Sequence, residues 1–221
     1  MRDVRDSARQ AARQPSDGAH PPPIRLFVAI QLPAALAERA ADVLPGDLRG
    51  LRRVPAALLH LTLAFIGSVP AETVQPARDA LRAAARSSAP IDACLDRLGR
   101  FPRSGPPAVL WLGAGTGAKE LGAVADRVRA RLEERDLPFD HKPFAAHVTL
   151  ARVTPAVELE DARSIEGRLA ATAVPRLDFR VDSIQLVESV LSRKGARYVQ
   201  LEEAALGRPR SGDPDGEPDG R

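Results

Sequence analysis

The chain has 221 residues, of which 44% are hydrophobic and 28% charged, and its formal net charge at pH 7 is +3. No apolar run approaches the roughly eighteen residues that cross a bilayer, and the charged, proline-rich amino terminus is unlike a signal peptide, so no membrane association is expected. The single cysteine, Cys94, excludes an internal disulfide and lies in an apolar stretch typical of a buried thiol, which favours a cytoplasmic location.

Both ends of the chain are predicted to be disordered tails. Residues 1–23 mix charged side chains with a run of three prolines, and residues 207–221 repeat Gly, Pro and Asp without an apolar anchor. The folded domain is therefore expected to comprise residues 24–206.

Hydrophobic spacing and the positions of Gly and Pro predict the elements of this domain in chain order. The first half is expected to hold a strand at 24–30, a helix at 34–44, a strand at 58–66, a helix at 71–87, and strands at 91–100 and 108–113. The second half is expected to hold a helix at 118–135, a strand at 147–153, a helix at 157–170, and strands at 176–189 and 196–204.

A strand, a helix and paired strands thus follow one another twice. This repetition predicts an α+β fold of two lobes, each an antiparallel sheet with helices, related by a pseudo-twofold axis. The strands at 91–100 and 108–113 are expected to complete the first lobe.

A tetrapeptide pattern also recurs in the two halves. It reads His-Leu-Thr-Leu at residues 60–63 and His-Val-Thr-Leu at residues 147–150, each within a predicted strand. Because residues two apart in a strand share a face, each strand presents an imidazole beside a hydroxyl and turns its apolar residues into the core. A single His on a strand is more often structural, but two copies of the pattern in a chain with four His rarely arise by chance.

Paired histidines suit proton transfer during cleavage of a phosphate ester. The unperturbed pKa of histidine lies near 6.5, so His60 and His147 can act together as general acid and general base. The hydroxyls of Thr62 and Thr149 can donate hydrogen bonds to a phosphoryl oxygen as its charge builds up. No His, Cys, Asp or Glu cluster has the spacing of metal ligands, so neither a metal nor another cofactor is expected.

With these motifs the chain resembles the 2H phosphoesterase superfamily and, within it, the RNA 2′,3′-cyclic phosphodiesterases once called 2′-5′ RNA ligases. The resemblance covers residues 24–206. It rests on Arg25–Ile30, Leu59–Gly67, Val109–Gly113, Pro143-Phe144 and His147–Arg152. It implies a bilobal fold in which both motifs face a central groove.

The resemblance also implies an enzyme that hydrolyses RNA 2′,3′-cyclic phosphate ends to 2′-phosphomonoesters. His60 is expected to be the proton donor to the leaving 3′-oxygen and His147 the proton acceptor that activates water, while Thr62, Thr149 and Arg152 bind the substrate. By microscopic reversibility, a weak 2′-5′ RNA ligase activity is expected in the opposite direction. The expected partner is RNA with a cyclic phosphate terminus or a related nucleotide, bound by a monomer without an obligate protein partner.

The role of Arg152 depends on the local backbone. Strict alternation along a strand places Arg152 on the face opposite to His147 and Thr149. A β-bulge, or the end of the strand, is needed to bring its guanidinium to the phosphate. Without one, Arg152 is a solvent-facing arginine.

Several other residues have competing interpretations. His141 could line the rim of the groove, although a surface loop is the more common place for such a residue. Phe27 is expected in the core, and Tyr198 either in the core or stacked on a base. The Gly-rich segment 113–120 follows a strand and precedes a helix, but it lacks the Gly-Lys-Ser/Thr ending of a phosphate-binding loop, so a flexible connection is expected.

Two alternatives to RNA-end hydrolysis stay open at this stage. One is a non-catalytic module that only binds RNA ends, although a pure binder has no need of two imidazoles. The other is a phosphodiesterase that acts on small cyclic nucleotides or on the cyclic phosphate of ADP-ribose. Turnover of mononucleotide and oligonucleotide substrates separates these cases.

Overall fold

The computed structural model describes residues 22–154, 159–192 and 195–207, without the side chains of 159–163. Apart from residues 22, 23 and 207, both predicted tails lie outside this part of the chain.

The structure contains an antiparallel sheet and four α-helices in the described residues. The strands are β1 (Ile24–Gln31), β2 (Leu51–Arg53), β3 (His60–Val69), β4 (Ile91–Phe101), β5 (Val109–Ala114), β6 (His147–Val153), β7 (Leu177–Val181), β8 (Ser183–Ser192) and β9 (Gly195–Ala205). The helices are α1 (Ala34–Ala41), α2 (Val74–Arg86), α3 (Ala118–Glu133) and α4 (Leu159–Ala171), with short 3-10 turns at Ala56–Leu58 and Ala71–Thr73. The short strand β2 was not predicted, and the predicted segment 176–189 comprises two strands, β7 and β8; the other strands were predicted to within a few residues.

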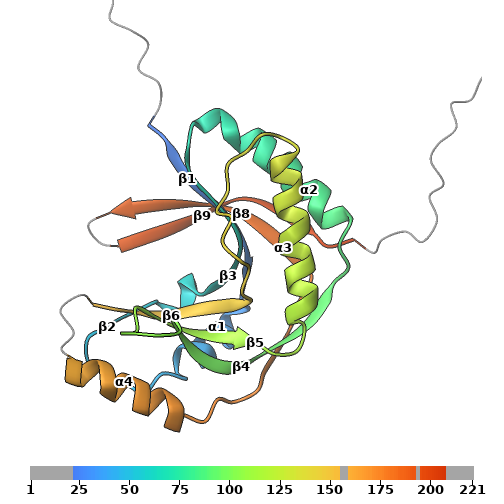
Figure 1. Ribbon diagram of the computed structural model, residues 1–221. Coiled ribbons are helices and arrows are strands. Elements are labelled where there is room, and N and C mark those ends of the chain that lie inside the picture. Colours follow the sequence, from blue (N-terminus) through green and yellow to red (C-terminus); the bar gives the residue numbers. More distant parts are fainter. Residues whose placement is uncertain (1–21, 155–158, 193–194, 208–221) are drawn as a thin grey trace, which may run out of the picture.

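The strands form one sheet in the order β7-β4-β5-β6-β3-β1-β8-β9, and β2 pairs with the outer part of β6. At the centre, β3 and β6 are joined by a single residue pair, Leu61 with Val148, so the sheet opens there into two lobes (Figure 1). Outward from this junction the order is β6-β5-β4-β7 on one side and β3-β1-β8-β9 on the other. The predicted α+β fold with two related lobes is confirmed.

The prediction of which strands complete which lobe was wrong. Strands β4 and β5 pair with β6 and β7 in the second lobe, whereas β8 and β9 return to β1 in the first. Alternating hydrophobicity shows that a segment is extended, but strand partners are chosen by packing between distant segments. Each half of the chain therefore contributes strands to both lobes.

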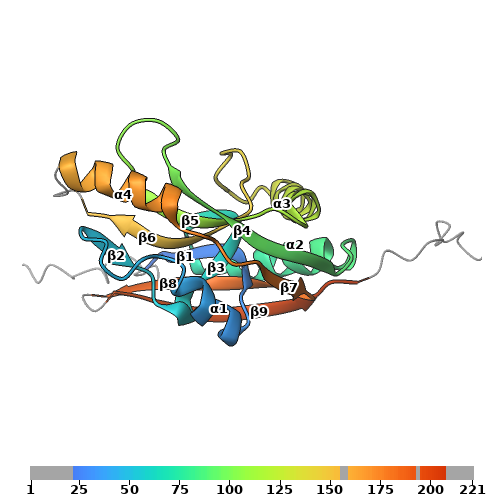
Figure 2. The same cartoon turned by 90° about the horizontal axis from the view of Figure 1, so that it is seen from below.

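Helices α2 and α3 pack against each other at one end of the molecule, away from α4 (Figures 1 and 2). Helix α3 also contacts β3 and β4, so it spans both lobes. Its buried residues are the ones that helical spacing predicted: Leu121, Val124, Ala125, Val128 and Leu132. This apolar face of α3 packs against both lobes at the end of the molecule where α2 and α3 lie.

Strand β1 is buried on both faces, and the two faces serve different purposes. Leu26, Val28 and Ile30 belong to the main hydrophobic core. Phe27 and Ala29 point to the other side, where they form a small cluster with Val187. Because alternate residues share a face, this second side of β1 forms part of the surface between the lobes.

Candidate active site

The central strand pair brings the two His-x-Thr motifs together. Leu61 and Val148 are paired in antiparallel register and fully buried, so the motif residues on either side point to the opposite face. Continued by one residue, this register sets His60 beside Thr149 and Thr62 beside His147. In agreement with this register, His60 and Thr149 line one pocket, and His147 and Thr62 line a second one beside it.

A β-bulge interrupts each motif strand at the same place. Along β1, Val28 and Ala29 pair with Ala64 and Thr62, which leaves Leu63 without a partner. Along β5, Leu110 and Trp111 pair with Ala151 and Thr149, which leaves Leu150 without one. In both strands two consecutive buried residues follow the threonine, so the next side chain returns to the motif face.

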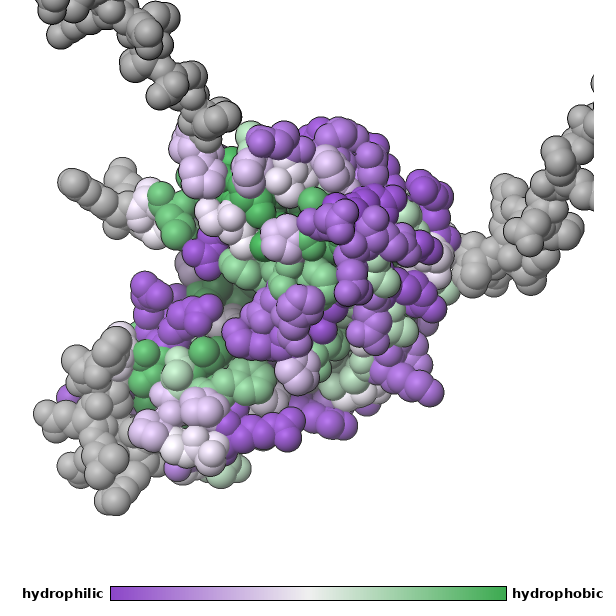
Figure 3. All heavy atoms as spheres, turned by 45° about the horizontal axis from the view of Figure 1, so that its top comes forward, coloured by the Kyte–Doolittle hydropathy of each residue, from purple (hydrophilic) through white to green (hydrophobic). Residues whose placement is uncertain are grey.

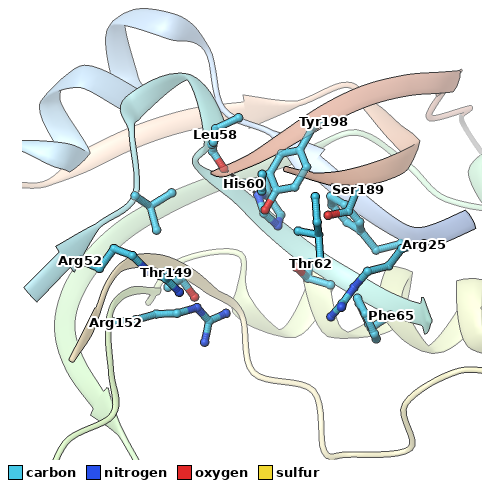
Figure 4. A pocket seen from close by; sticks show the side chains of 14 residues that line it. Arg25, Arg52, Leu58, His60, Thr62, Phe65, Thr149, Arg152, Ser189 and Tyr198 are labelled. Atoms are coloured by element: carbon cyan, nitrogen blue, oxygen red, sulfur yellow. Dashed lines mark hydrogen bonds between the residues drawn. The ribbon is translucent and has the colours of Figure 1, made fainter. Parts of the chain in front are cut away.

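That next side chain is Phe65 in β3 and Arg152 in β6. The bulge that a role for Arg152 requires is thus present, and the Arg152 guanidinium lies on the same side as Thr149 (Figure 4). The two six-residue segments, 60–65 and 147–152, are identical at four positions and similar at the second, whereas the last position is aromatic in one lobe and cationic in the other.

The motif face borders a groove of about 590 Å³ between the lobes. In the space-filling view it forms a hollow with hydrophobic atoms in its floor and hydrophilic residues around it (Figure 3). Four of the five predicted site residues line the groove: His60, Thr62, Thr149 and Arg152. His147 lines an adjoining hollow that shares Thr62 with the groove.

The groove is positively charged. Arg25, Arg52 and Arg152 line it, and among its described lining residues none is Asp or Glu. In Figure 4, Arg25 lies at one end beside Phe65, with its guanidinium carbon 4.8 Å from the ring centroid, whereas Arg52 and Arg152 lie at the other end. Such a surface attracts a phosphate-bearing ligand at both ends.

Each motif histidine is anchored through the same ring nitrogen. The Nδ1 of His60 lies 2.8 Å from the carbonyl oxygen of Leu58, and the Nδ1 of His147 lies 2.7 Å from that of Ala145. A carbonyl oxygen only accepts, so Nδ1–H is the donor in both bonds. The Nε2 atom of each imidazole is thereby left to exchange protons with a substrate.

Aromatic side chains enclose both imidazoles. The rings of Phe27 and Tyr198 have centroids 4.9 and 5.2 Å from that of His60. Burial lowers the pKa of His60, and the nearby His147 lowers it further, while the bond to the Leu58 carbonyl raises it. The charged form of His60 is therefore disfavoured until an anion approaches.

His147 has a matching environment in the second lobe. Its ring centroid lies 5.1 Å from that of Phe101 and 6.2 Å from that of Trp111. Burial lowers the pKa of His147, and the hydrogen bond to the Ala145 carbonyl opposes this shift.

Glycines make room for the Trp111 ring. Gly99 lies opposite Trp111 on β4, and a Cβ atom there would overlap the indole. A Cβ at Gly113 would lie 2.8 Å from Cζ3 of the same ring. Neither glycine has a positive φ, so the backbone conformation does not require glycine. Glycine is required because the indole leaves no room for a side chain at these positions.

Of the remaining candidates, Tyr198 and the buried Phe27 border the groove, and the others fall outside the site. Tyr198 lines the groove, whereas His141 lies exposed in a loop with its ring 4.4 Å from that of Phe139. Gly117, with φ of 77°, begins α3, so the Gly-rich segment is a strand-to-helix connection. Cys94 is buried, and burial raises the pKa of its thiol.

Arg25 and Arg52 were not predicted to be site residues. Arg25 shares a strand face with Phe27 and Ala29, a signal that alternation along β1 contained. Arg52 lies on β2, opposite Arg152. A three-residue strand leaves little pattern in a sequence.

Two features are absent from the residues that the structure describes. No helix within them is long and apolar enough to span a membrane. No three of their His, Cys, Asp and Glu side chains gather in a way that would hold a metal ion.

Comparison with known proteins identifies the family. Residues 32–193 match the family model described as the 2′-5′ RNA ligase superfamily. The chain is 34% identical over 211 residues to the RNA 2′,3′-cyclic phosphodiesterase of Thermus thermophilus, covering 89% of this chain and all of that one.

Solved structures agree with this assignment. The crystal structure of TT0787 from Thermus thermophilus has a TM-score of 0.66 at 32% identity, covering 82% of this chain and 97% of that one. The structure of Escherichia coli LigT complexed with 3′-AMP has a TM-score of 0.65 at 30% identity, covering 84% and 99%. The chain belongs to the 2′-5′ RNA ligase superfamily, whose members are 2H phosphoesterases.

Proposed function

We propose that this protein hydrolyses the 2′,3′-cyclic phosphate at the end of an RNA chain and leaves a 2′-phosphomonoester. The observation that carries the proposal is the convergence of two His-x-Thr motifs at the central strand pair, beside an arginine-lined groove. Relatives that bear the name RNA 2′,3′-cyclic phosphodiesterase support the substrate class.

In the proposed mechanism the two imidazoles act on opposite sides of the phosphorus. Nε2 of His147 accepts a proton from water as the water oxygen bonds to phosphorus. Nε2–H of His60 donates a proton to the 3′-oxygen as its bond to phosphorus breaks. The 2′-oxygen keeps the phosphate, and the imidazoles exchange protons with solvent before the next turnover.

The threonines and Arg152 stabilise the charge that builds up on the phosphoryl oxygens. Because the strand register sets each motif histidine beside the threonine of the other motif, Thr62 and Thr149 are placed to donate hydrogen bonds from both sides. The Arg152 guanidinium can form two parallel hydrogen bonds with one phosphate. All three donors lie on the two central strands, β3 and β6.

Electrostatics explains how one buried imidazole carries a proton at the start of the reaction. Burial lowers the pKa of both histidines in the free protein. A bound cyclic phosphate carries a negative charge, which favours the protonated form of the neighbouring ring. The substrate thus helps to charge its own general acid, His60.

The groove also supports a nucleotide rather than a bare phosphate as the ligand. Phe65 and Tyr198 offer ring surfaces for a base, and Arg25 supplies a further cation for the RNA backbone. We place the reaction in the cytoplasm, in keeping with a buried, unpaired Cys94.

The test is to incubate the protein, in a chelating buffer, with an RNA oligonucleotide that ends in a 2′,3′-cyclic phosphate. The proposal expects a terminal 2′-phosphomonoester, identified by its resistance to an enzyme specific for 3′-phosphates. Binding without turnover would instead make the protein an RNA-end binding module. A higher kcat/KM for nucleoside 2′,3′-cyclic phosphates or ADP-ribose cyclic phosphate would move the substrate to small molecules.

A further inference from the structure

Two arginines of the groove lie directly opposite each other on neighbouring strands. Arg52 of β2 pairs in register with Arg152 of β6, and both line the groove. Directly opposite residues of an antiparallel pair point to the same face of the sheet, with Cβ atoms about 5 Å apart. Figure 4 shows both side chains at the end of the groove away from Arg25.

Neither of these guanidinium groups is neutralised by the protein. Within the part of the chain that the structure describes, Arg52 and Arg152 form no side-chain hydrogen bond and no ion pair, and no Asp or Glu lines the groove. By contrast, Arg100 of β4 lies 2.7 Å from a carboxylate oxygen of Glu166. Like charges directly opposite each other in a sheet are destabilising, and a bound anion removes that repulsion.

Backbone and side-chain hydrogen bonds attach β2 to its neighbours. The N–H of Val54, just after β2, donates over 2.8 Å to the carbonyl oxygen of Leu150, the residue that the bulge leaves without a partner on β5. The Arg53 guanidinium, on the other face of β2, donates to two carbonyl oxygens of the loop that follows α1. These bonds join Arg52 to the bulged strand that carries Arg152.

The cyclic phosphate has its donors without Arg52. In the proposed mechanism Thr62, Thr149 and Arg152 contact its oxygens, and all three belong to the two motif strands. An RNA end carries a second negative group nearby, the phosphodiester that joins its terminal nucleotide to the rest of the chain. This phosphodiester lies one ribose away from the cyclic phosphate, and Arg52 lies one strand away from Arg152. Since guanidinium groups match the geometry of phosphate oxygens, the two arginines can hold two consecutive phosphates.

We propose that Arg52 binds the phosphodiester on the 5′ side of the terminal nucleotide, while Arg152 contacts the cyclic phosphate. This inference rests on the proposed function and adds a residue that determines specificity. It implies selection for RNA ends over free nucleoside 2′,3′-cyclic phosphates, because the free nucleotides lack the second phosphate. Arg25, at the opposite end of the groove, is the competing residue, so the test separates the two arginines.

Two small substrates isolate the second phosphate. One is adenosine 2′,3′-cyclic phosphate, and the other is the same compound with a methyl phosphodiester on its 5′-oxygen. They differ by this phosphodiester and its negative charge, and neither carries a second base. The measured quantity is the ratio of kcat/KM for the phosphodiester compound to kcat/KM for the plain one. A general loss of activity in a variant cancels in this ratio.

Wild-type protein should show a ratio of about five, the effect of one exposed ion pair with good geometry. Arg52→Gln should lower the ratio to about one, whereas Arg52→Lys, which keeps the charge without the planar donors, should retain part of it. Because salt screens exposed charges, the wild-type ratio should also fall towards one at about 1 M salt. The matched control is Arg39→Gln, which removes an exposed arginine of α1 outside the groove and should keep the wild-type ratio.

The outcomes separate this inference from the proposed function. A wild-type ratio of one, or activity on RNA ends but on neither small substrate, would refute the role of Arg52 and leave the proposed function standing. So would a ratio that Arg25→Gln abolishes and Arg52→Gln preserves, or one that Arg39→Gln lowers as far as Arg52→Gln does. Wild-type protein inactive on both small substrates and on RNA with a 2′,3′-cyclic phosphate end would refute the proposed function, and the role of Arg52 with it.

Discussion

Replacing Gly99 by alanine should disturb catalysis from outside the groove. An ideal Cβ at Gly99 would overlap two ring carbons of Trp111 and lie 2.8 Å from a third, Cζ3, where about 3.5–4.0 Å is normal between carbon atoms. The indole must therefore move by about 1 Å. It packs against Phe101, 5.2 Å between centroids, and both rings contact His147.

The expected magnitudes follow from these contacts. Forcing extra volume into a packed site costs about 1–3 kcal/mol of unfolding free energy. A displacement of about 1 Å at a catalytic group lowers the rate about 10²-fold, so kcat should fall by that order while the groove around His60 stays intact. Because Trp111 is the only tryptophan, its fluorescence should report the displaced ring directly.

Gly167→Ala is the matched control. A Cβ at Gly167, exposed in α4, meets nothing within 4 Å, so the same substitution should leave kcat unchanged and stabilise the helix by about 0.5–1 kcal/mol. Denaturant unfolding and kcat are measured for both variants. Gly99→Ala protein with wild-type stability and wild-type kcat would refute the argument that these glycines position His147 through Trp111.

Four further predictions concern the residues of the site. Thr62→Val and Thr149→Val, which keep the side-chain shape, should each lower kcat about 10²-fold. A change in KM alone would show that the threonines do not stabilise the transition state. Arg152→Lys keeps the charge but loses the planar pair of donors, so KM for a cyclic phosphate substrate should rise about tenfold, and an unchanged KM would place Arg152 outside the phosphate site. Since burial lowers the pKa of both His60 and His147, kcat/KM should peak below pH 6.5 and fall on either side as the pair loses or gains its second proton. Because the pKa values of these histidines are lower in the folded protein than in the unfolded chain, the unfolded chain binds protons at a higher pH. The free energy of unfolding should therefore decrease as pH falls below 6.5. In His60→Gln this decrease should be smaller.

Much of the fold and the centre of the site could be predicted from the sequence because period-two patterns are local. The paired motifs predicted two buried strands, and alternation identified the side chains that meet on one face. Alternation also showed that Arg152 needs a bulge, which the structure has at Leu150.

The features that were missed depend on contacts between distant segments. Strands β4 and β5 lie in the second lobe, and β8 and β9 lie in the first. This arrangement follows from pairing between distant segments, which no local pattern encodes. Arg52 reaches the groove because the three-residue β2 pairs with β6. The hollow beside His147 is closed by the loop that carries Phe144, a segment without regular secondary structure.

Alanine substitution of each motif histidine tests the two-imidazole mechanism most directly. His60→Ala and His147→Ala are assayed in a chelating buffer on RNA with a 2′,3′-cyclic phosphate end, with circular dichroism to verify folding. Each variant should fold normally and lose about 10²–10⁴-fold in kcat, the contribution of one positioned acid or base. A folded variant of either kind that turns over at the wild-type rate would contradict the assignment of these imidazoles as the acid and base.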